Sequence, residues 1–132
     1  MIFVDTSFWV ALRNRRDDHH RQARSLFRLH AATPLISSNQ VRGETWTFLR
    51  RRVGHASAAG FLDFIGESAR LHVEHVDEAT EEEAIGWLRR HDEREYSFVD
   101  ATSFALMRQL GIGEAFAFDG EFAAAGLVEL RP

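Results

Sequence analysis

Short apolar runs alternate along the chain with longer stretches in which apolar residues recur every three to four positions. The short runs have the length of buried strands, and the longer stretches have the period of amphipathic helices. The expected strands are residues 2–4, 35–36, 71–76, 115–118 and 127–130. The expected helices run from the first strand to about residue 13, then over residues 17 or 18 to 29, 37 to about 52, 58–65, 78–91 and 97–110. Strands separated by helices predict an α/β domain, with a mostly parallel central sheet and helices on both faces.

Turn and capping residues support these boundaries. Thr33-Pro34 ends the second helix, and Ser37-x-x-Gln40 has the spacing of a capping box at the start of the third. Gly111 and Gly113 follow the last helix, and Asp119-Gly120 predicts a turn. Residues 71–76 alternate apolar and polar side chains, which is typical of a less buried edge strand.

The composition narrows the class of protein. The 132 residues fit a single domain over 1–132, and the absence of cysteine excludes disulfides and thiolate metal sites. The apolar start is interrupted at Asp5 and no basic segment precedes it, so it does not resemble a signal peptide. No apolar stretch approaches the ~18–20 residues of a membrane span. We therefore expect a cytoplasmic protein with no membrane contact.

The charge pattern is unusual because all 16 basic residues are arginine, while the formal net charge is −4. Overall charge therefore does not favour nucleic-acid binding, but local arginine clusters could bind phosphates. Solvated helix faces are the alternative for each cluster. The clusters are Arg13, Arg15 and Arg16; Arg50, Arg51 and Arg52; and Arg89 and Arg90. The missing lysine also excludes receiver domains and haloacid-dehalogenase-type phosphatases, and no glycine-rich phosphate loop is present.

Two aspartates follow expected strands. Asp5 comes directly after residues 2–4, and Asp119 directly after residues 115–118. Each aspartate also has a purely structural explanation, since Asp5 could simply cap the next helix and Asp119 could simply form the Asp-Gly turn. Taken together, they place two carboxylates at the carboxyl ends of parallel strands, where open α/β sheets bind ligands.

Glu44 lies within the expected helix 37–52 and shares a helical face with Val41 and Phe48. That apolar stripe is predicted to point into the core. A buried carboxylate must be paired or bind a metal, because burying it alone costs several kcal/mol. We therefore expect either an arginine partner or a metal role for Glu44.

Asp100 occurs in Ser97-x-x-Asp100, at the start of the last long helix. A capping box explains this spacing without any function. The functional interpretation differs only in the direction of the Asp100 side chain. The apolar neighbours Phe98, Val99 and Ala101 predict that this first turn packs against the sheet.

Four carboxylates gathered in one place would repel one another and their pKa values would rise. A hard divalent cation removes this conflict, and Mg²⁺ or Mn²⁺ prefers oxygen ligands. Such a metal activates water and neutralises charge on a phosphodiester. Thr6 and Ser7 add hydroxyls beside Asp5, which could hold a metal-bound water or simply cap the helix.

These motifs resemble the PIN-domain ribonucleases, and within them the VapC toxins of bacterial toxin–antitoxin pairs. The resemblance covers essentially the whole chain. The segments that carry it are Ile2-Phe-Val-Asp5-Thr-Ser7, the Glu44 helix, Tyr96-Ser-Phe-Val-Asp100-Ala-Thr-Ser-Phe-Ala105, and Ala117-Phe-Asp119-Gly-Glu-Phe122. The stretch from Tyr96 to Ala105 and the Phe-Asp-x-x-Phe ending are the most specific parts of the resemblance.

The resemblance implies that Asp5, Glu44, Asp100 and Asp119 form an acidic Mg²⁺ site, with Mn²⁺ as a substitute. It also implies an RNA substrate cut by metal-activated water, a homodimer, and a cognate antitoxin that covers the active-site groove. Glu121 departs from many relatives, which lack an acid there, and could be a ligand or a bystander. Two other functions stay open: a PIN-like binding module with little catalysis, and a housekeeping PIN nuclease in RNA maturation.

Overall fold

The computed structural model describes residues 1–132 and has one five-stranded sheet, with the strand order β3-β2-β1-β4-β5. Every pair of neighbouring strands is parallel. The strands are β1 (Ile2–Val4), β2 (Leu35–Ser38), β3 (Leu71–Glu74), β4 (Glu114–Phe116) and β5 (Val128–Glu129). The helices are α1 (Thr6–Arg13), α2 (His20–Leu29), α3 (Asn39–Arg52), α4 (His55–Glu67), α5 (Glu78–Arg90), α6 (Phe98–Leu110) and α7 (Glu121–Ala124).

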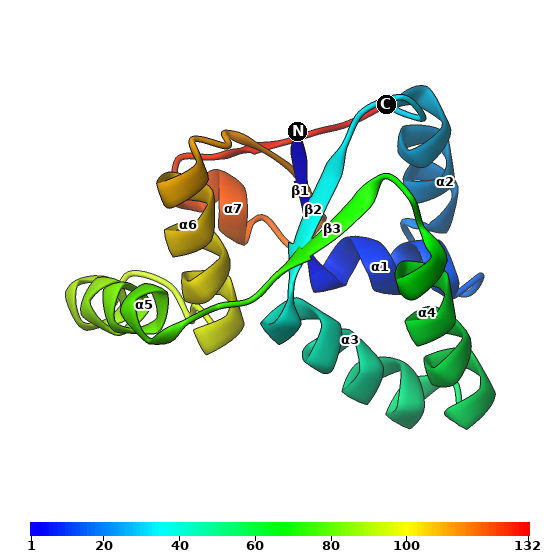
Figure 1. The fold of residues 1–132 in the computed structure, drawn as a ribbon, viewed down its shortest axis with the longest axis horizontal. Coiled ribbons are helices and arrows are strands. Elements are labelled where there is room, and N and C mark those ends of the chain that lie inside the picture. Colours follow the sequence, from blue (N-terminus) through cyan, green and yellow to red (C-terminus); the bar gives the residue numbers. More distant parts are fainter.

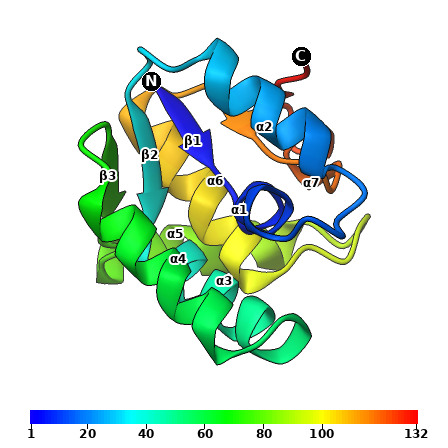
Figure 2. The ribbon, with the colours of Figure 1, turned by 90° about the vertical axis from the view of Figure 1, so that its right-hand side faces the viewer.

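Helices cover both faces of this sheet, as the sequence predicted. Figure 1 shows α5, α6 and α7 on one side of the strands and α1, α2 and α4 on the other. Helix α3 lies across the end of the sheet at which β1 and β2 finish, and it contacts α1, α4 and α6. Figure 2, turned by 90°, shows the N-terminal strand between α2 and α6. The carboxyl ends of the central strands therefore open toward α1 and α3.

All expected strands are present, and β3 is an edge strand as its alternating pattern predicted. It ends at Glu74, two residues before the expected boundary at 76. Helix α2 begins at His20, later than expected, because Asp17 accepts a hydrogen bond from the His19 backbone in a turn. Helix α7 was not predicted, since its four residues are too short to show a helical period.

The expected capping box at Ser37 is wrong by one residue. Ser38 caps α3 and accepts a hydrogen bond from the Val41 backbone at 3.1 Å. The Ser37 hydroxyl instead donates to the Val4 carbonyl at 2.8 Å and accepts from the Trp9 indole. Because β2 pairs with β1, Ser37 is used between strands and is not free to cap a helix.

Aromatic side chains from distant segments form much of the core. The rings of Phe8 and Phe116 stack with centroids 4.4 Å apart, and Phe104 meets Phe122 edge-on at 4.9 Å. All four are fully buried. Each such ring removes about 150–250 Å² from water, so this cluster fixes α1, α6 and α7 against the sheet. None of the helices is both long enough and apolar enough to span a bilayer.

Candidate active site

The four acids predicted from the sequence line a single cavity of about 440 Å³ at the carboxyl ends of β1 and β4. They come from four different segments of the chain. These are Asp5 after β1, Glu44 on α3, Asp100 in the first turn of α6, and Asp119 after β4. We call this cavity the acidic cleft. A larger hollow along α3 shares Glu44 and Phe48 with it, so the two are continuous.

Asp5 both caps α1 and faces the acidic cleft, so its two sequence interpretations hold together. Its Oδ2 accepts hydrogen bonds from the Ser7 backbone at 3.1 Å and the Ser7 hydroxyl at 2.7 Å. The residue is 2% exposed. Burial, followed by the neighbouring Asp119 carboxylate, raises the pKa of Asp5 to about 8. Asp5 therefore carries a proton at neutral pH unless a cation enters the cleft.

Asp119 forms the predicted turn and also faces the acidic cleft. Its Oδ1 accepts a hydrogen bond from the Glu121 backbone at 3.0 Å, and Gly120 adopts a left-handed φ of 81°. Burial raises the pKa of Asp119 to about 6, and Asp100 adds to the shift. A glycine is needed in this turn because a side chain would be strained at that φ.

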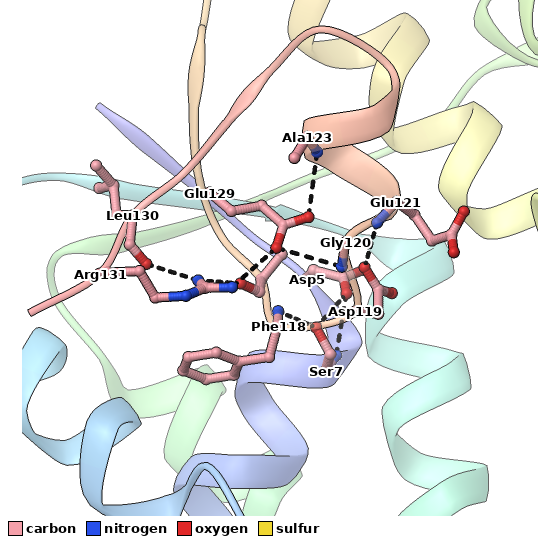
Figure 3. Close-up of polar contacts among 11 residues, drawn as sticks. Asp5, Ser7, Phe118, Asp119, Gly120, Glu121, Ala123, Glu129, Leu130 and Arg131 are labelled. Atoms are coloured by element: carbon pink, nitrogen blue, oxygen red, sulfur yellow. Dashed lines mark hydrogen bonds and ion pairs between the residues drawn. The ribbon is translucent and has the colours of Figure 1, made fainter.

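The Asp119 turn is held by groups that the sequence interpretation missed. Figure 3 shows the Glu129 carboxylate accepting from the Gly120 backbone at 3.3 Å and the Ala123 backbone at 3.1 Å. Arg131 donates to the same carboxylate at 3.1 Å. No motif signals this role, because Glu129 looks like an ordinary polar residue in a strand until β5 is placed beside β4.

Ser7 links the two aspartate segments. Its hydroxyl donates to Asp5 and accepts from the Phe118 backbone at 3.0 Å (Figure 3). The chain around Asp119 is thus tied to the start of α1, which is more than a hundred residues away. Its single proton is committed to Asp5, so this hydroxyl orients that carboxylate and could bind a water only by accepting a hydrogen bond from it.

Asp100 forms the predicted capping box and lines the cleft as well. Its Oδ2 accepts from the Ser97 backbone at 3.0 Å, and its own backbone donates to the Ser97 hydroxyl at 2.9 Å. Burial raises the pKa of Asp100, and the charge of Glu44 contributes in the same direction. The cap fixes one carboxylate oxygen and directs the side chain toward the other acids.

Glu44 does not point into the core, so that expectation is wrong. The buried stripe of α3 is Val41, Thr45 and Leu49, while Glu44 and Phe48 are half-buried and line the acidic cleft. The helix is rotated from the expected orientation because its deepest face packs against both α1 and α4. Glu44 has no arginine partner and makes no side-chain hydrogen bond.

The cleft is also lined by Thr6, Asp17 and His19, but not by Glu121. Thr6 Oγ1 is buried without any hydrogen-bond partner, and it lies beside Asp5. Asp17 and His19 also line the cleft, although the sequence placed them only at a helix start. Glu121 does not line it: its carboxylate is bound by Arg94 at 2.9 and 3.1 Å. Glu121 is therefore engaged in a surface ion pair.

The donor set of the cleft fits a hard divalent cation. The carboxyl groups of Asp5, Asp100 and Asp119 have raised pKa values and no arginine partner. The Thr6 hydroxyl, which has no hydrogen-bond partner, could bind a water of the cation's shell. No set of three or more Asp, Glu or His side chains is arranged as ready-made metal ligands. Mg²⁺ usually keeps several waters and takes one or two carboxylates directly, so such a set is not required.

Comparisons with known proteins agree with the geometry. The PIN domain family matches residues 2–127. The 23S rRNA-specific endonuclease VapC20 of Mycobacterium tuberculosis, in strains CDC 1551 / Oshkosh and ATCC 25618 / H37Rv, is 58% identical over all of this chain and 99% of the relative. The crystal structure of M. tuberculosis VapC20, described as a sarcin-ricin loop cleaving toxin, superposes with a TM-score of 0.93 at 54% identity, covering 100% of both chains. The chain belongs to the PIN-domain family and, within it, to the VapC proteins.

Proposed function

We propose that this chain is a Mg²⁺-dependent endoribonuclease that cuts 23S rRNA in its sarcin–ricin loop and acts as the toxin of a toxin–antitoxin pair. The observation that carries this proposal is the convergence of four acids from distant segments on one cleft, none of them paired with an arginine. The 58% identity to VapC20 over the whole chain supports the substrate. Mn²⁺ is expected to replace Mg²⁺, because both prefer oxygen ligands.

In this proposal, Asp5 and Asp100 hold the cation most directly, since both are buried and oriented by hydrogen bonds from Ser7 and Ser97. Asp119 and Glu44 complete the negative potential of the cleft. The bound cation would supply activated water and charge neutralisation on the phosphodiester. Ser7 and Ser97 hold the Asp5 and Asp100 carboxylates in place, and the acids of the cleft would lose their protons if a cation were bound.

Two partners belong to the proposal. A cognate antitoxin is expected to cover the acidic cleft and its continuation along α3, and the toxin itself is expected to be a homodimer. The antitoxin is supported only by the family. The half-buried and exposed apolar residues along α4 and α5, such as Leu62 and Ile85, offer surface for a second copy.

The two alternatives predict different behaviour. A binding module with little catalysis would have no reason to keep three aspartates with raised pKa values in one cleft, two of them buried. A housekeeping nuclease would cut RNA precursors and would leave the sarcin–ricin loop intact. The high identity to a 23S rRNA-specific endonuclease favours the toxin over both.

The test is cleavage of purified ribosomes and of total RNA by the wild type and by Asp5→Asn, in Mg²⁺, Mn²⁺ and EDTA. We expect one discrete 23S rRNA fragment pair that needs both the cation and Asp5. Fragments at another site would contradict the substrate but keep the nuclease. Folded, antitoxin-free wild type that cuts nothing would favour the binding module.

A further inference from the structure

A second polar hollow, of about 390 Å³, lies where α1 and α3 end. Arginines from both helices and from the connection after α1 surround it, and we call it the arginine hollow. Its lining is Arg13, Asn14, Arg15, Arg16, Arg52 and Val53. Two clusters that looked separate in the sequence thus share one concave surface.

The arginines of this hollow have no acidic partners. The chain has 20 acidic residues, yet its arginines make only three ion pairs with carboxylates, through Arg94, Arg108 and Arg131. Gathering four guanidinium groups around one hollow is unfavourable, because like charges repel. Such an arrangement is stabilised when an anion occupies the hollow, and the planar guanidinium group binds phosphate through two parallel hydrogen bonds.

Two of these guanidinium groups are held in place by aromatic rings. Arg13 lies over the Phe64 ring at 5.2 Å, and Arg52 lies over the Phe48 ring at 5.0 Å. Cation–π contacts of this kind orient the charge without neutralising it. Less side-chain freedom is then lost when an anion binds, so the hollow is partly preorganised.

The arginine hollow is connected to the acidic cleft through α1 and α3, which pack together (Figure 1). Phe48 lines the cleft, while Arg52, stacked on it, lines the hollow. Helix α1 starts next to Asp5 and ends at Arg13. At ~1.5 Å per residue its eight residues span about 12 Å, which equals roughly three to four stacked nucleotides at ~3.4 Å each.

We infer that the arginine hollow binds backbone phosphates of the RNA strand a few nucleotides from the bond that the acidic cleft cleaves. The inference rests on the proposed function for its ligand. A net charge of −4 and an acidic cleft repel RNA, so a nearby positive site is needed to hold the strand. Such a contact would fix the position of the strand without reading its sequence.

The test compares two pairs of adjacent, exposed arginines. R15Q/R16Q changes the hollow, and R89Q/R90Q on α5 removes the same charge elsewhere. R52Q is a second variant on α3. All three are made with Asp5→Asn, so that RNA stays intact, and binding to a labelled sarcin–ricin hairpin is followed by fluorescence anisotropy at several salt concentrations. Thermal melting verifies that each variant is folded.

We expect R15Q/R16Q to weaken binding about tenfold at low salt and R52Q severalfold, with R89Q/R90Q within about twofold of the parent. The salt slope of R15Q/R16Q should fall by about 1.4, because each single-strand phosphate contact contributes ~0.7. Equal losses in both pairs would overturn the inference, since only net charge would then matter. Unchanged hairpin binding by R15Q/R16Q and R52Q would also overturn it, even if inhibition by an antitoxin were lost.

Cleavage is measured separately, with Asp5 restored and saturating enzyme in single turnover. We expect R89Q/R90Q to stay within about twofold of the wild-type rate, whereas R15Q/R16Q should need about tenfold more enzyme to reach its saturating rate, because these arginines act on binding. If the wild type does not cleave, the proposed function fails, whereas the hairpin-binding comparison still decides whether the arginine hollow binds RNA.

Discussion

Asp5, which follows β1, and Glu129, on β5, are two buried carboxylates on the strands that flank β4, yet their surroundings are opposite (Figure 3). The Glu129 side chain is 4% exposed and receives two backbone hydrogen bonds and an arginine. Asp5 is 2% exposed and receives hydrogen bonds only from Ser7, while the negative charges of Asp119 and Asp100 raise its pKa. One acid is fully satisfied by the protein, and the other is not.

The difference shows how a stable structure can hold an unstable group. The Glu129 network fixes the turn that carries Asp119, and Ser7 ties that turn to Asp5. Rigid support of this kind keeps the repelling acids of the cleft from moving apart or toward solvent. The repulsion is then available to bind a cation, which is how a site gains affinity from its own strain.

Substituting Asp5, the carboxylate without a compensating partner, should have the largest effect. We predict that Asp5→Asn lowers the rate of RNA cleavage by about 10³-fold, because charge opposite the phosphodiester is lost. In EDTA its free energy of unfolding should stay about equal near pH 7, where Asp5 is protonated, and should rise relative to wild type above pH 8, where Asp5 would otherwise be charged beside Asp119. Initial rates in Mg²⁺ and urea unfolding check both parts. A variant that cleaves at the wild-type rate would rule out Asp5 as a metal ligand.

Substituting Glu129, the carboxylate that is fully hydrogen-bonded, should act mainly on stability. We predict that Glu129→Ala lowers the free energy of unfolding by about 2–3 kcal/mol, because the Gly120 and Ala123 N–H groups and Arg131 lose a charged acceptor. The exposed Glu82→Ala is the matched control and should stay within about 0.5 kcal/mol. Urea unfolding measures both. Equal effects of the two substitutions would mean that the Glu129 contacts contribute nothing net.

The pH dependence of stability sharpens the comparison further. The pKa of Asp5 is raised from 3.8 to about 8, and that of Asp119 from 3.8 to about 6. Between pH 3.8 and the raised pKa of each group, the folded state therefore binds more protons than the unfolded state. In EDTA the melting temperature should therefore fall by several degrees as pH rises from about 5 to about 8.

Mg²⁺ should reverse this trend, because it replaces the protons as the neutralising charge. At 100 times its dissociation constant it adds about 2.7 kcal/mol of stability. The gain should be larger at pH 8 than at pH 5.5, where protons compete for the same oxygens. Differential scanning calorimetry at both pH values, with Mg²⁺ or EDTA, checks this. A gain that is independent of pH would place the bound cation outside the acidic cleft.

The smallest effect is expected for Glu121, whose ion pair with Arg94 holds it outside the cleft. We predict that Glu121→Gln changes the cleavage rate by about twofold or less and stability by less than ~1 kcal/mol, because its ion pair with Arg94 is partly exposed. Single-turnover rates and urea unfolding measure these. A large loss of rate with normal stability would instead make Glu121 part of the metal site.

Much of the candidate site could be predicted because it depends on local chain signals. Asp5 and Asp119 were predicted from strand ends, whereas Asp100 was predicted as a site residue from the family resemblance, with the Ser97 capping box as the local alternative. The structure brings all three to one cleft. Glu44 was predicted as a site residue, but its direction was wrong, because the rotation of α3 is set by packing against two helices that lie elsewhere in the sequence.

The α/β class, a mostly parallel sheet and the acids at the strand ends could be predicted from local sequence, because hydrophobic period and capping chemistry act over a few residues. Three arrangements became visible only in the folded chain: Ser38 caps α3, Glu129 supports the Asp119 turn, and Arg13 and Arg52 meet at one hollow. These arrangements join residues far apart along the chain, and no local pattern encodes which of them will become neighbours.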